Sequence, residues 1–215
     1  MEKIRIAIDG PSGAGKSTVA KAIAKKMGID YIDTGAMYRA VGYKLIQNGV
    51  SLSDIEKIKD MLDQTEIDFS NGEIILDGEI ISDRIRTQEI SRMASDASAL
   101  PVVREKLVAL QRKIGEEKSI VMDGRDIGTN VLKDAEYKFF LTATPKERAH
   151  RRWLELSEKG QEAEFERILA EIIERDKNDS TRELNPLRKA EDAVEIDSTG
   201  QNVEQTTEEI LGHIK

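Results

Sequence analysis

The sequence contains no cysteine, only two histidines and few aromatic side chains. The absence of cysteine excludes a disulfide framework and a thiolate metal site. His150 and His213 have no neighbours in the sequence that would complete a metal-ligand set, so we interpret each as an ordinary residue on the surface of a helix. Because 39% of the residues are hydrophobic and only 4% aromatic, we expect a mainly aliphatic core.

The sequence also lacks a long apolar run and an excess of positive charge. No apolar segment approaches the ~20 residues that a membrane-spanning helix needs. The chain enters its first predicted strand with no room for a signal peptide, so we expect a cytoplasmic protein that does not bind membranes. The formal net charge is −8, which disfavours general nucleic-acid binding because that binding is mostly electrostatic.

Glycine is concentrated instead in one loop near the N-terminus. Residues 4–8 form a short apolar run typical of a buried strand, and a helix is predicted over 16–27. Between them, residues 10–17 fit the pattern G-x-x-x-x-G-K-[ST], whose chance occurrence in a chain of this composition is on the order of one in a hundred. The order of strand, glycine-rich loop and helix predicts binding of a nucleoside triphosphate.

Each residue type in this loop has a physical reason to be there. Glycines let the backbone N–H groups converge on phosphate oxygens, and the N-terminus of the following helix favours the same anion. Lys16 can reach the β- and γ-phosphates, and the Ser17 hydroxyl suits Mg²⁺. The candidate nucleotide-binding residues of the loop are Gly10, Pro11, Ser12, Gly13, Ala14, Gly15, Lys16, Ser17 and Thr18.

The remainder of the chain alternates between predicted strands and helices, with one interruption. Five strands separated by helices predict an open five-stranded parallel sheet with helices on both faces. We assign residues 1–33 and 97–215 to this core domain. Residues 34–96 form a predicted insertion, in which Ser53 is expected to cap a helix over 54–64. Three short β-type runs over about 65–82, joined by Asn-Gly and Asp-Gly, predict an antiparallel meander there.

Two further groups of charged residues could serve the same site. Asp123 ends a predicted strand, where a carboxylate can hold Mg²⁺, although Asp-Gly is also an ordinary turn. Arg175, Asp179 and Arg182 are spaced to share one helix face, either as an ion-pair ladder or as groups that grip a substrate. Arginine suits the bidentate recognition of phosphate, so the many arginines of this acidic protein indicate phosphoryl transfer between two phosphorylated substrates.

The alternative of a GTP-hydrolysing switch fits less well. Such a protein would carry an Asn-Lys-x-Asp sequence, whereas residues 176–179 read Asp-Lys-Asn-Asp. A switch also has no use for the many arginines. We therefore favour a small-molecule kinase.

Several ordered blocks along nearly the whole chain resemble the bacterial cytidylate kinases, a family of nucleoside monophosphate kinases. The blocks lie at residues 8–16, 33–39, 85–89, 123–129, 147–152 and 174–176. The resemblance implies transfer of the γ-phosphoryl group of ATP, with Mg²⁺, to CMP or dCMP. Another small-molecule kinase of this fold, of the UMP/CMP or shikimate type, is the alternative.

The resemblance also implies roles for individual residues. Ser95 and Asp126 would read the edge of the base, Asp179 would contact the sugar, and a short lid over about 152–164 would cover ATP. The implied catalytic residues are Lys16, Arg125, Arg148 and Arg152. The implied monophosphate site comprises Thr34, Arg39, Ser95, Arg104, Arg125, Asp126, Arg175, Asp179 and Arg182. Arg151 and, less specifically, residues 197–199 would contact ATP, and Ser17 and Asp123 would hold Mg²⁺. We expect a monomer that acts on small molecules.

Overall fold

The computed structural model describes residues 3–70 and 72–215, which divide into two compact units. The core unit comprises Met1–Tyr31 and Ser119–Lys215, and the smaller unit comprises Ile32–Lys118. Among the helices of the described residues, none combines the length and the apolar composition that crossing a membrane requires.

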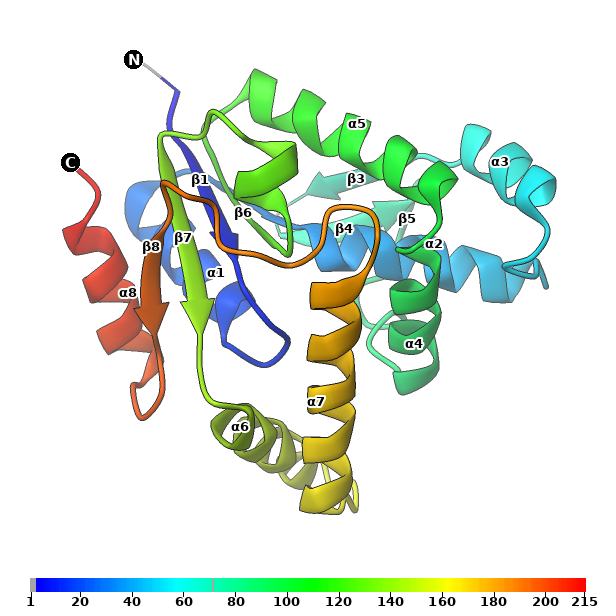
Figure 1. The fold of residues 1–215 in the computed structure, drawn as a ribbon. Coiled ribbons are helices and arrows are strands. Elements are labelled where there is room, and N and C mark those ends of the chain that lie inside the picture. The colour runs from blue at the N-terminus through cyan, green and yellow to red at the C-terminus, as the bar shows by residue number, and fades with distance from the viewer. Residues whose placement is uncertain (1–2, 71) are drawn as a thin grey trace. The chain divides into compact units, whose positions relative to one another are not determined.

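The core unit is built on a five-stranded sheet in the order β2-β6-β1-β7-β8 (Figure 1). The strands are β1 (Arg5–Asp9), β2 (Asp30–Asp33), β6 (Ile120–Gly124), β7 (Tyr137–Thr142) and β8 (Val194–Asp197). The central strand β1 pairs in parallel with β6 and β7, and β7 pairs in parallel with β8. The glycine-rich loop therefore leaves from the centre of the sheet, which confirms the predicted fold class.

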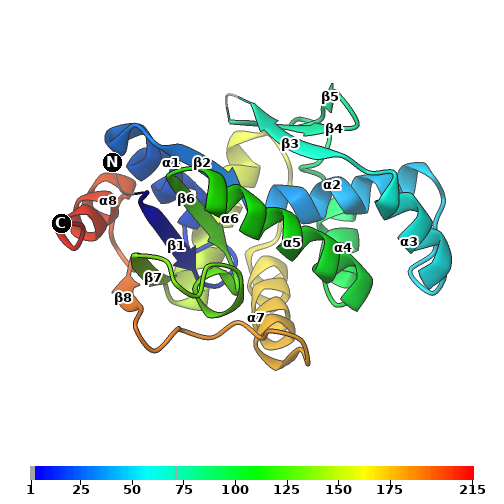
Figure 2. The ribbon, with the colours of Figure 1, turned by 90° about the horizontal axis from the view of Figure 1, so that it is seen from above.

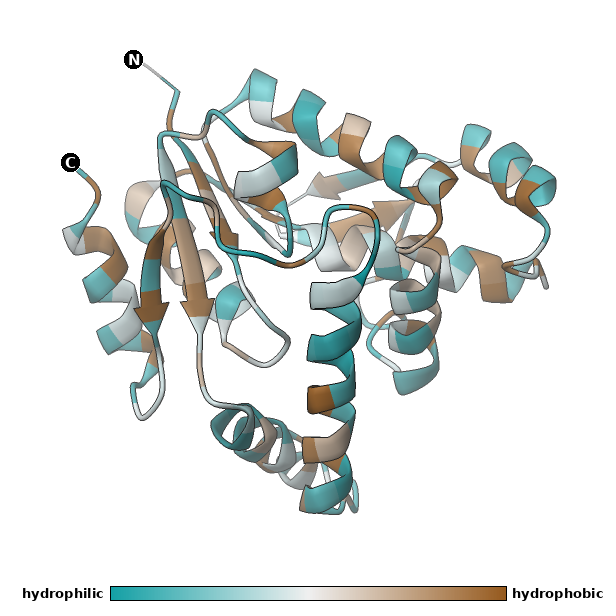
Figure 3. Ribbon diagram, in the orientation of Figure 1, coloured by the Kyte–Doolittle hydropathy of each residue, from teal (hydrophilic) through white to brown (hydrophobic). Residues whose placement is uncertain are grey.

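Both faces of the central strand are covered. Ile6 and Ile8 pack with α1 (Lys16–Met27) and α8 (Val203–Gly212) in one aliphatic cluster, which Phe139 also joins. Ala7, which points to the opposite face, is also fully buried. Figure 3 shows the strands of the sheet largely in the brown of hydrophobic residues. This pattern is the one expected for a parallel sheet buried on both sides.

The remaining elements of the core unit follow the carboxyl ends of β6 and β7. A five-residue π-helix, η1 (Ile127–Val131), comes directly after β6 and was not predicted. After β7, α6 (Pro145–Glu158) and α7 (Phe165–Thr181) pack together around Ala149, Ile168 and Ile172. The segment predicted as a lid thus begins inside α6, and only residues 159–164 connect the two helices.

The smaller unit contains a three-stranded antiparallel meander and four helices (Figure 2). The meander consists of β3 (Ile67–Ser70), β4 (Glu73–Leu76) and β5 (Glu79–Ile80), as predicted. At its second turn, Asp77 and Gly78 both have positive φ, as a type I′ hairpin turn requires. The first turn includes Asn71, which lies outside the described residues.

The helices of this unit are α2 (Thr34–Gln47), α3 (Ile55–Asp63), α4 (Gln88–Ala97) and α5 (Pro101–Glu117). Gly42 lets α2 and α4 approach closely, because a Cβ atom there would lie 3.0 Å from the backbone N of Ala94. Two expectations differ from the structure. Asp54 rather than Ser53 caps α3, through its side chain and the N–H of Lys57. The helix α5 packs on α2 and α3, so this unit extends to Lys118 rather than to residue 96.

Candidate active site

The loop between β1 and α1 has a backbone that only glycine can follow at three positions. Gly10, Gly13 and Gly15 all have positive φ. A Cβ atom on Gly10 would lie 1.9 Å from the carbonyl oxygen of Leu141, and one on Gly13 would lie 3.1 Å from the Cβ of Arg148. The loop is therefore held against β7 and α6, and its shape is fixed by close backbone contacts.

Lys16 opens α1 and turns its side chain back over this loop. Its Nζ donates a hydrogen bond of 2.8 Å to the carbonyl oxygen of Pro11, and the residue is 6% exposed. Burial, together with a smaller effect of the nearby Arg125 guanidinium, lowers the pKa of Lys16 to about 7. An anion bound in the loop would offset both effects, so the electrostatics favour a phosphate there.

Ser17 and Asp123 meet beside the loop. The Ser17 hydroxyl donates to Asp123 Oδ2 at 2.9 Å, while the Tyr31 hydroxyl donates to Asp123 Oδ1 at 2.8 Å. Sequence reasoning missed Tyr31, because nothing in a β2 residue signals a contact across 92 positions of the chain.

The pair formed by Ser17 and Asp123 fits a magnesium ion. A hydroxyl and a carboxylate are the hard oxygen ligands that Mg²⁺ prefers, and this ion is usually held by one or two protein groups with phosphates and water completing its octahedron. Within the described ranges, no group of three or more acidic, histidine or cysteine side chains could hold a metal by itself.

Arg148 joins the loop to both helices of the α6–α7 pair. Its guanidinium donates to the carbonyl oxygens of Ser12 at 3.0 Å and of Ala143 at 2.8 Å, and it forms a bidentate ion pair with Asp176 of α7 at 3.0 and 2.6 Å. The side chain is only 3% exposed. Arg148 thus holds the glycine-rich loop in place beside α6 and α7.

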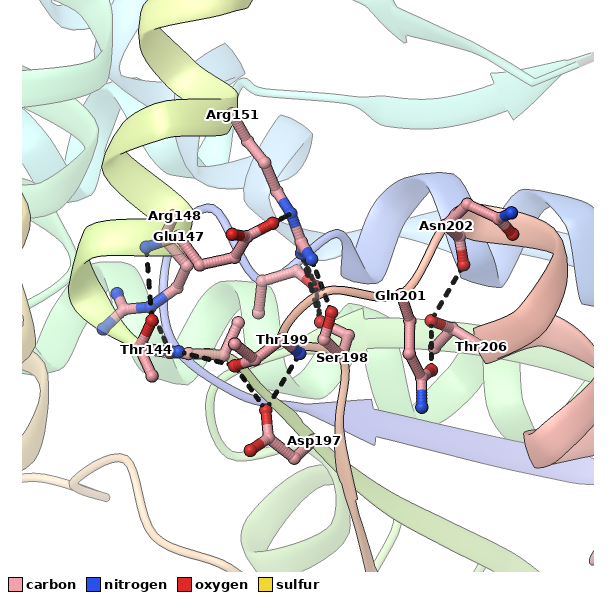
Figure 4. A network of polar contacts seen from close by, with 12 residues as sticks. Thr144, Glu147, Arg148, Arg151, Asp197, Ser198, Thr199, Gln201, Asn202 and Thr206 are labelled. Atoms are coloured by element: carbon pink, nitrogen blue, oxygen red, sulfur yellow. Dashed lines mark hydrogen bonds and ion pairs between the residues drawn. The ribbon is translucent and has the colours of Figure 1, made fainter.

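Arg151, one helical turn further along α6, ties the loop to the end of β8 (Figure 4). Its guanidinium donates to the carbonyl oxygen of Ser198 at 2.6 Å and to that of Ala14 at 3.4 Å. The buried Ser198 hydroxyl bonds the carbonyl oxygen of Thr142 at 3.0 Å. By contrast, Arg152 lies exposed and pairs with Glu155 on its own helix at 2.8 Å.

A second group of charged residues lies between the segment after β6 and the end of α7. Arg125 pairs with Asp179 at 2.8 Å, and Arg182 pairs with Asp126 at 3.1 Å. The helix α7 ends at Thr181, so Arg182 lies just beyond it in extended backbone and not on the helix face that the spacing predicted. Arg175 lies on α7, one helical turn before Asp179.

These arginines determine the charge state of Asp179. Burial alone would raise the pKa of the Asp179 carboxyl, but the Arg125 guanidinium, with smaller contributions from Arg175 and Arg182, holds it below its usual range. Asp179 therefore stays ionised, and an anionic ligand would find three guanidinium groups close to the two buried carboxylates of Asp126 and Asp179.

Asp9, the last residue of β1, is a further buried acid that sequence reasoning missed. Its two carboxylate oxygens each accept a 2.8 Å hydrogen bond, one from the N–H of Ile127 and one from that of Gly128. Burial raises the pKa of Asp9 to about 6, although the two backbone hydrogen bonds act in the opposite direction. A strand-ending acid directly before the glycine-rich loop is the one signal that could have found it.

The smaller unit holds the other predicted site residues. Thr34 is buried at the start of α2, and Arg39 on the same helix pairs with Asp33 at 3.0 Å. Ser95 lies half-buried on α4. Arg104 on α5 is buried, with its guanidinium carbon 6.0 Å from the centre of the Tyr38 ring. All four lie on α2 or on the helices α4 and α5, which pack on it.

A model of the cytidylate kinase family matches residues 6–215 of the chain. The chain belongs to this family. It is 52% identical to a cytidylate kinase of Caldicellulosiruptor saccharolyticus, over 98% of this chain and 95% of that protein. It is 49% identical to a cytidylate kinase of Clostridioides difficile, over 100% of this chain and 99% of that protein. The resemblance inferred from the ordered sequence blocks is thereby confirmed.

Solved structures agree on the fold. A crystal structure of an uncharacterised protein from Eubacterium ventriosum superposes with a TM-score of 0.56, covering 99% of this chain and 98% of that one at 18% identity. At this level of identity the likeness concerns the fold alone.

Proposed function

We propose that the protein transfers the γ-phosphoryl group of ATP, bound with Mg²⁺, to the 5′-phosphate of CMP or dCMP, which gives ADP and CDP or dCDP. The observation that carries this proposal is the combination of a glycine-rich phosphate loop with a second, arginine-lined group of residues in a chain of the cytidylate kinase family. One group suits a donor triphosphate and the other an acceptor phosphate.

On the donor side, the backbone N–H groups of the loop and the N-terminus of α1 would bind the β- and γ-phosphates. Lys16 would exchange its bond to Pro11 for the phosphate oxygens. Ser17 and Asp123 would hold Mg²⁺, which supplies charge neutralisation on the triphosphate. Arg151 and the segment at Ser198 would contact the rest of the nucleotide.

On the acceptor side, we assign monophosphate-binding roles to the residues that the family resemblance implies. Arg125, Asp126, Arg175, Asp179 and Arg182 come from the core unit, and Thr34, Arg39, Ser95 and Arg104 come from the smaller one. Ser95 and Asp126 would read the cytosine edge, and Asp179 would accept from the sugar. The pairing of Arg125 and Arg182 with carboxylates supports this role, since it holds both guanidinium groups in place before a phosphate binds.

The chemistry then needs no general base. The acceptor phosphate is already an anion, so catalysis consists of alignment and charge neutralisation by Lys16, Arg125 and Arg148. Arg152, which lies exposed on α6, would complete this set if the α6–α7 segment closes over ATP. Closure would also exclude water, which would otherwise hydrolyse the donor. We further propose that the protein acts as a monomer in the cytoplasm.

A coupled assay of ADP release tests this proposal across CMP, dCMP, UMP, AMP and shikimate. We expect rapid turnover with CMP and dCMP and at least about tenfold lower kcat/KM with UMP, because UMP exchanges a donor for an acceptor at the edge read by Ser95 and Asp126. Equal rates with CMP and UMP would remove the base-reading roles. ADP release that is independent of any acceptor would favour a hydrolase instead.

A further inference from the structure

The carboxylate of Asp9 has an unusual set of partners for a buried charge. Asp123, Asp126 and Asp179 bond to hydroxyl or guanidinium groups. Asp9 instead bonds two consecutive backbone amides, those of Ile127 and Gly128, at 2.8 Å each. The residue is 3% exposed. The Asp9 carboxylate therefore links the end of the central strand to the segment that contains these two amides.

That segment begins the π-helix η1. The first N–H groups of any helix have no partner within it, and a π-helix is rare and frequently found at functional sites. The residue at its N-cap is Asp126, a type that ordinarily caps its own helix with its side chain. Here the Asp126 side chain makes no cap hydrogen bond. Asp9 supplies the cap from the neighbouring strand.

Because Asp9 supplies the cap, the Asp126 carboxylate can make other contacts. Its Oδ1 accepts from Arg182 at 3.1 Å, and its Oδ2 accepts from the side-chain amide of Asn130 at 3.0 Å. Arg125, one residue earlier, is directed at Asp179. If Asp126 had to cap η1 itself, it could not keep this orientation. With the cap supplied by Asp9, both side chains make these contacts instead.

We propose that Asp9 is a positioning residue for the acceptor nucleotide, which caps η1 so that Asp126 and Arg125 are held in their binding orientations. The proposal rests on the proposed function, since it assumes that these two residues bind the monophosphate. Because Asp9 directly precedes Gly10, the same residue connects the strand that carries the donor loop to the segment that holds the acceptor.

The Asp9→Asn variant removes one of the two acceptor oxygens and turns an N–H₂ group toward a backbone N–H. Asp134→Asn is the matched control, because it removes a carboxylate that pairs with Arg5 on the surface of the same unit. We expect Asp9→Asn to raise the KM for CMP about tenfold or more, the size of effect typical when a supporting residue around a binding site is lost. The KM for ATP should stay within about twofold, and the control should change neither.

A readout without turnover separates this role from the proposed function. Hydrogen exchange followed by NMR should show the amides of Ile127 and Gly128 protected in the wild type and exchanging at least about tenfold faster in Asp9→Asn. If the wild type does not phosphorylate CMP, the proposed function fails, whereas the amide exchange still tests the cap. Asp9→Ser, which keeps one small acceptor, serves the same measurements if the asparagine variant does not fold.

A double-mutant cycle with Asp126→Asn tests whether Asp9 acts through Asp126. We expect Asp9→Asn to raise the KM for CMP much less in the Asp126→Asn background than in the wild type, because the positioned group is already lost. Equal fold-changes in the two backgrounds, or equal increases in the KM values for CMP and ATP, would overturn the proposal. Unchanged amide exchange in Asp9→Asn would overturn it as well.

Discussion

The loop that we propose binds the donor and the group of charged residues in the core unit that we propose binds the acceptor both carry positive charge, but they hold it differently. Around the donor loop, Lys16, Arg148 and Arg151 donate to backbone carbonyl oxygens of Pro11, Ser12 and Ser198. On the acceptor side, the arginines pair with carboxylates that lie 54 and 56 positions away in the sequence.

This difference bears on what each side recognises. A loop whose carbonyl oxygens are held by neighbouring cations keeps its backbone N–H groups available for phosphate oxygens, as a general triphosphate site requires. A group held by side-chain pairs can be altered one residue at a time, so it can distinguish one acceptor from another. Specificity should therefore depend on the pairs, and turnover on the loop.

The largest effect should come from the loop. Lys16→Ala removes a cationic side chain that reaches from α1 over the donor loop, and we expect kcat to fall on the order of 10³-fold. The coupled ADP-release assay measures it. Lys21→Ala is the control, because Lys21 is an exposed cation near the Tyr31 ring and should leave kcat within about twofold. Near-normal turnover of Lys16→Ala would contradict the assignment of the donor loop.

A substitution on the acceptor side should weaken the binding of CMP and leave the binding of ATP nearly unchanged. Asp179→Ala leaves Arg125 without its buried partner, and we expect the KM for CMP to rise about 10²-fold, equivalent to losing a charge-assisted hydrogen bond of roughly 2–3 kcal/mol. The KM for ATP should stay within about threefold. If the affinity for ATP fell instead, Asp179 would belong to the donor side, and the two groups would not serve different substrates.

Loss of the bidentate pair between Arg148 and Asp176 should lower the stability of the protein. Arg148→Met leaves a partly buried carboxylate unpaired, and we expect the free energy of unfolding to fall by roughly 3 kcal/mol. Thermal unfolding should detect this as a loss of several degrees in Tm. Arg152→Met, on the same helix, removes an exposed pair and should change stability by less than about 0.5 kcal/mol. Equal losses in the two variants would show that Arg148 does not anchor the loop.

The smallest effect should come from Tyr31→Phe, which removes only the hydroxyl that bonds Asp123. We expect a few-fold increase in the Mg²⁺ concentration needed for half-maximal activity, since such supporting groups orient metal ligands. Binding of Mn²⁺, followed by paramagnetic resonance in the presence of ADP, gives a second readout. A wild-type metal response would show that Ser17 alone is enough to orient Asp123.

The same contrast explains how much of the protein could be predicted from its sequence. The donor loop, the five strands and the meander depend on local patterns: glycines at fixed spacing, apolar runs, and Asp-Gly at a turn with positive φ. These features were predicted because their cause lies within a few residues.

The remaining features depend on contacts between distant positions. The π-helix η1 is capped by Asp9, which lies 118 positions earlier, so the sequence of residues 127–131 alone does not predict it. The end of α7 at Thr181 placed Arg182 outside the predicted helix face, yet its pair with Asp126 still brings it to the group. The spacing singled out Arg182 on the premise that the helix continued to it, and the resemblance to the family implied the same residue.

The most direct test of the two-sided site is to follow ATP and CMP by ³¹P NMR in one reaction with the purified protein. The account predicts that ADP and CDP accumulate in equal amounts, with no excess of free phosphate, and that replacing CMP by UMP slows the reaction at least about tenfold. Release of phosphate from ATP without formation of CDP would contradict it.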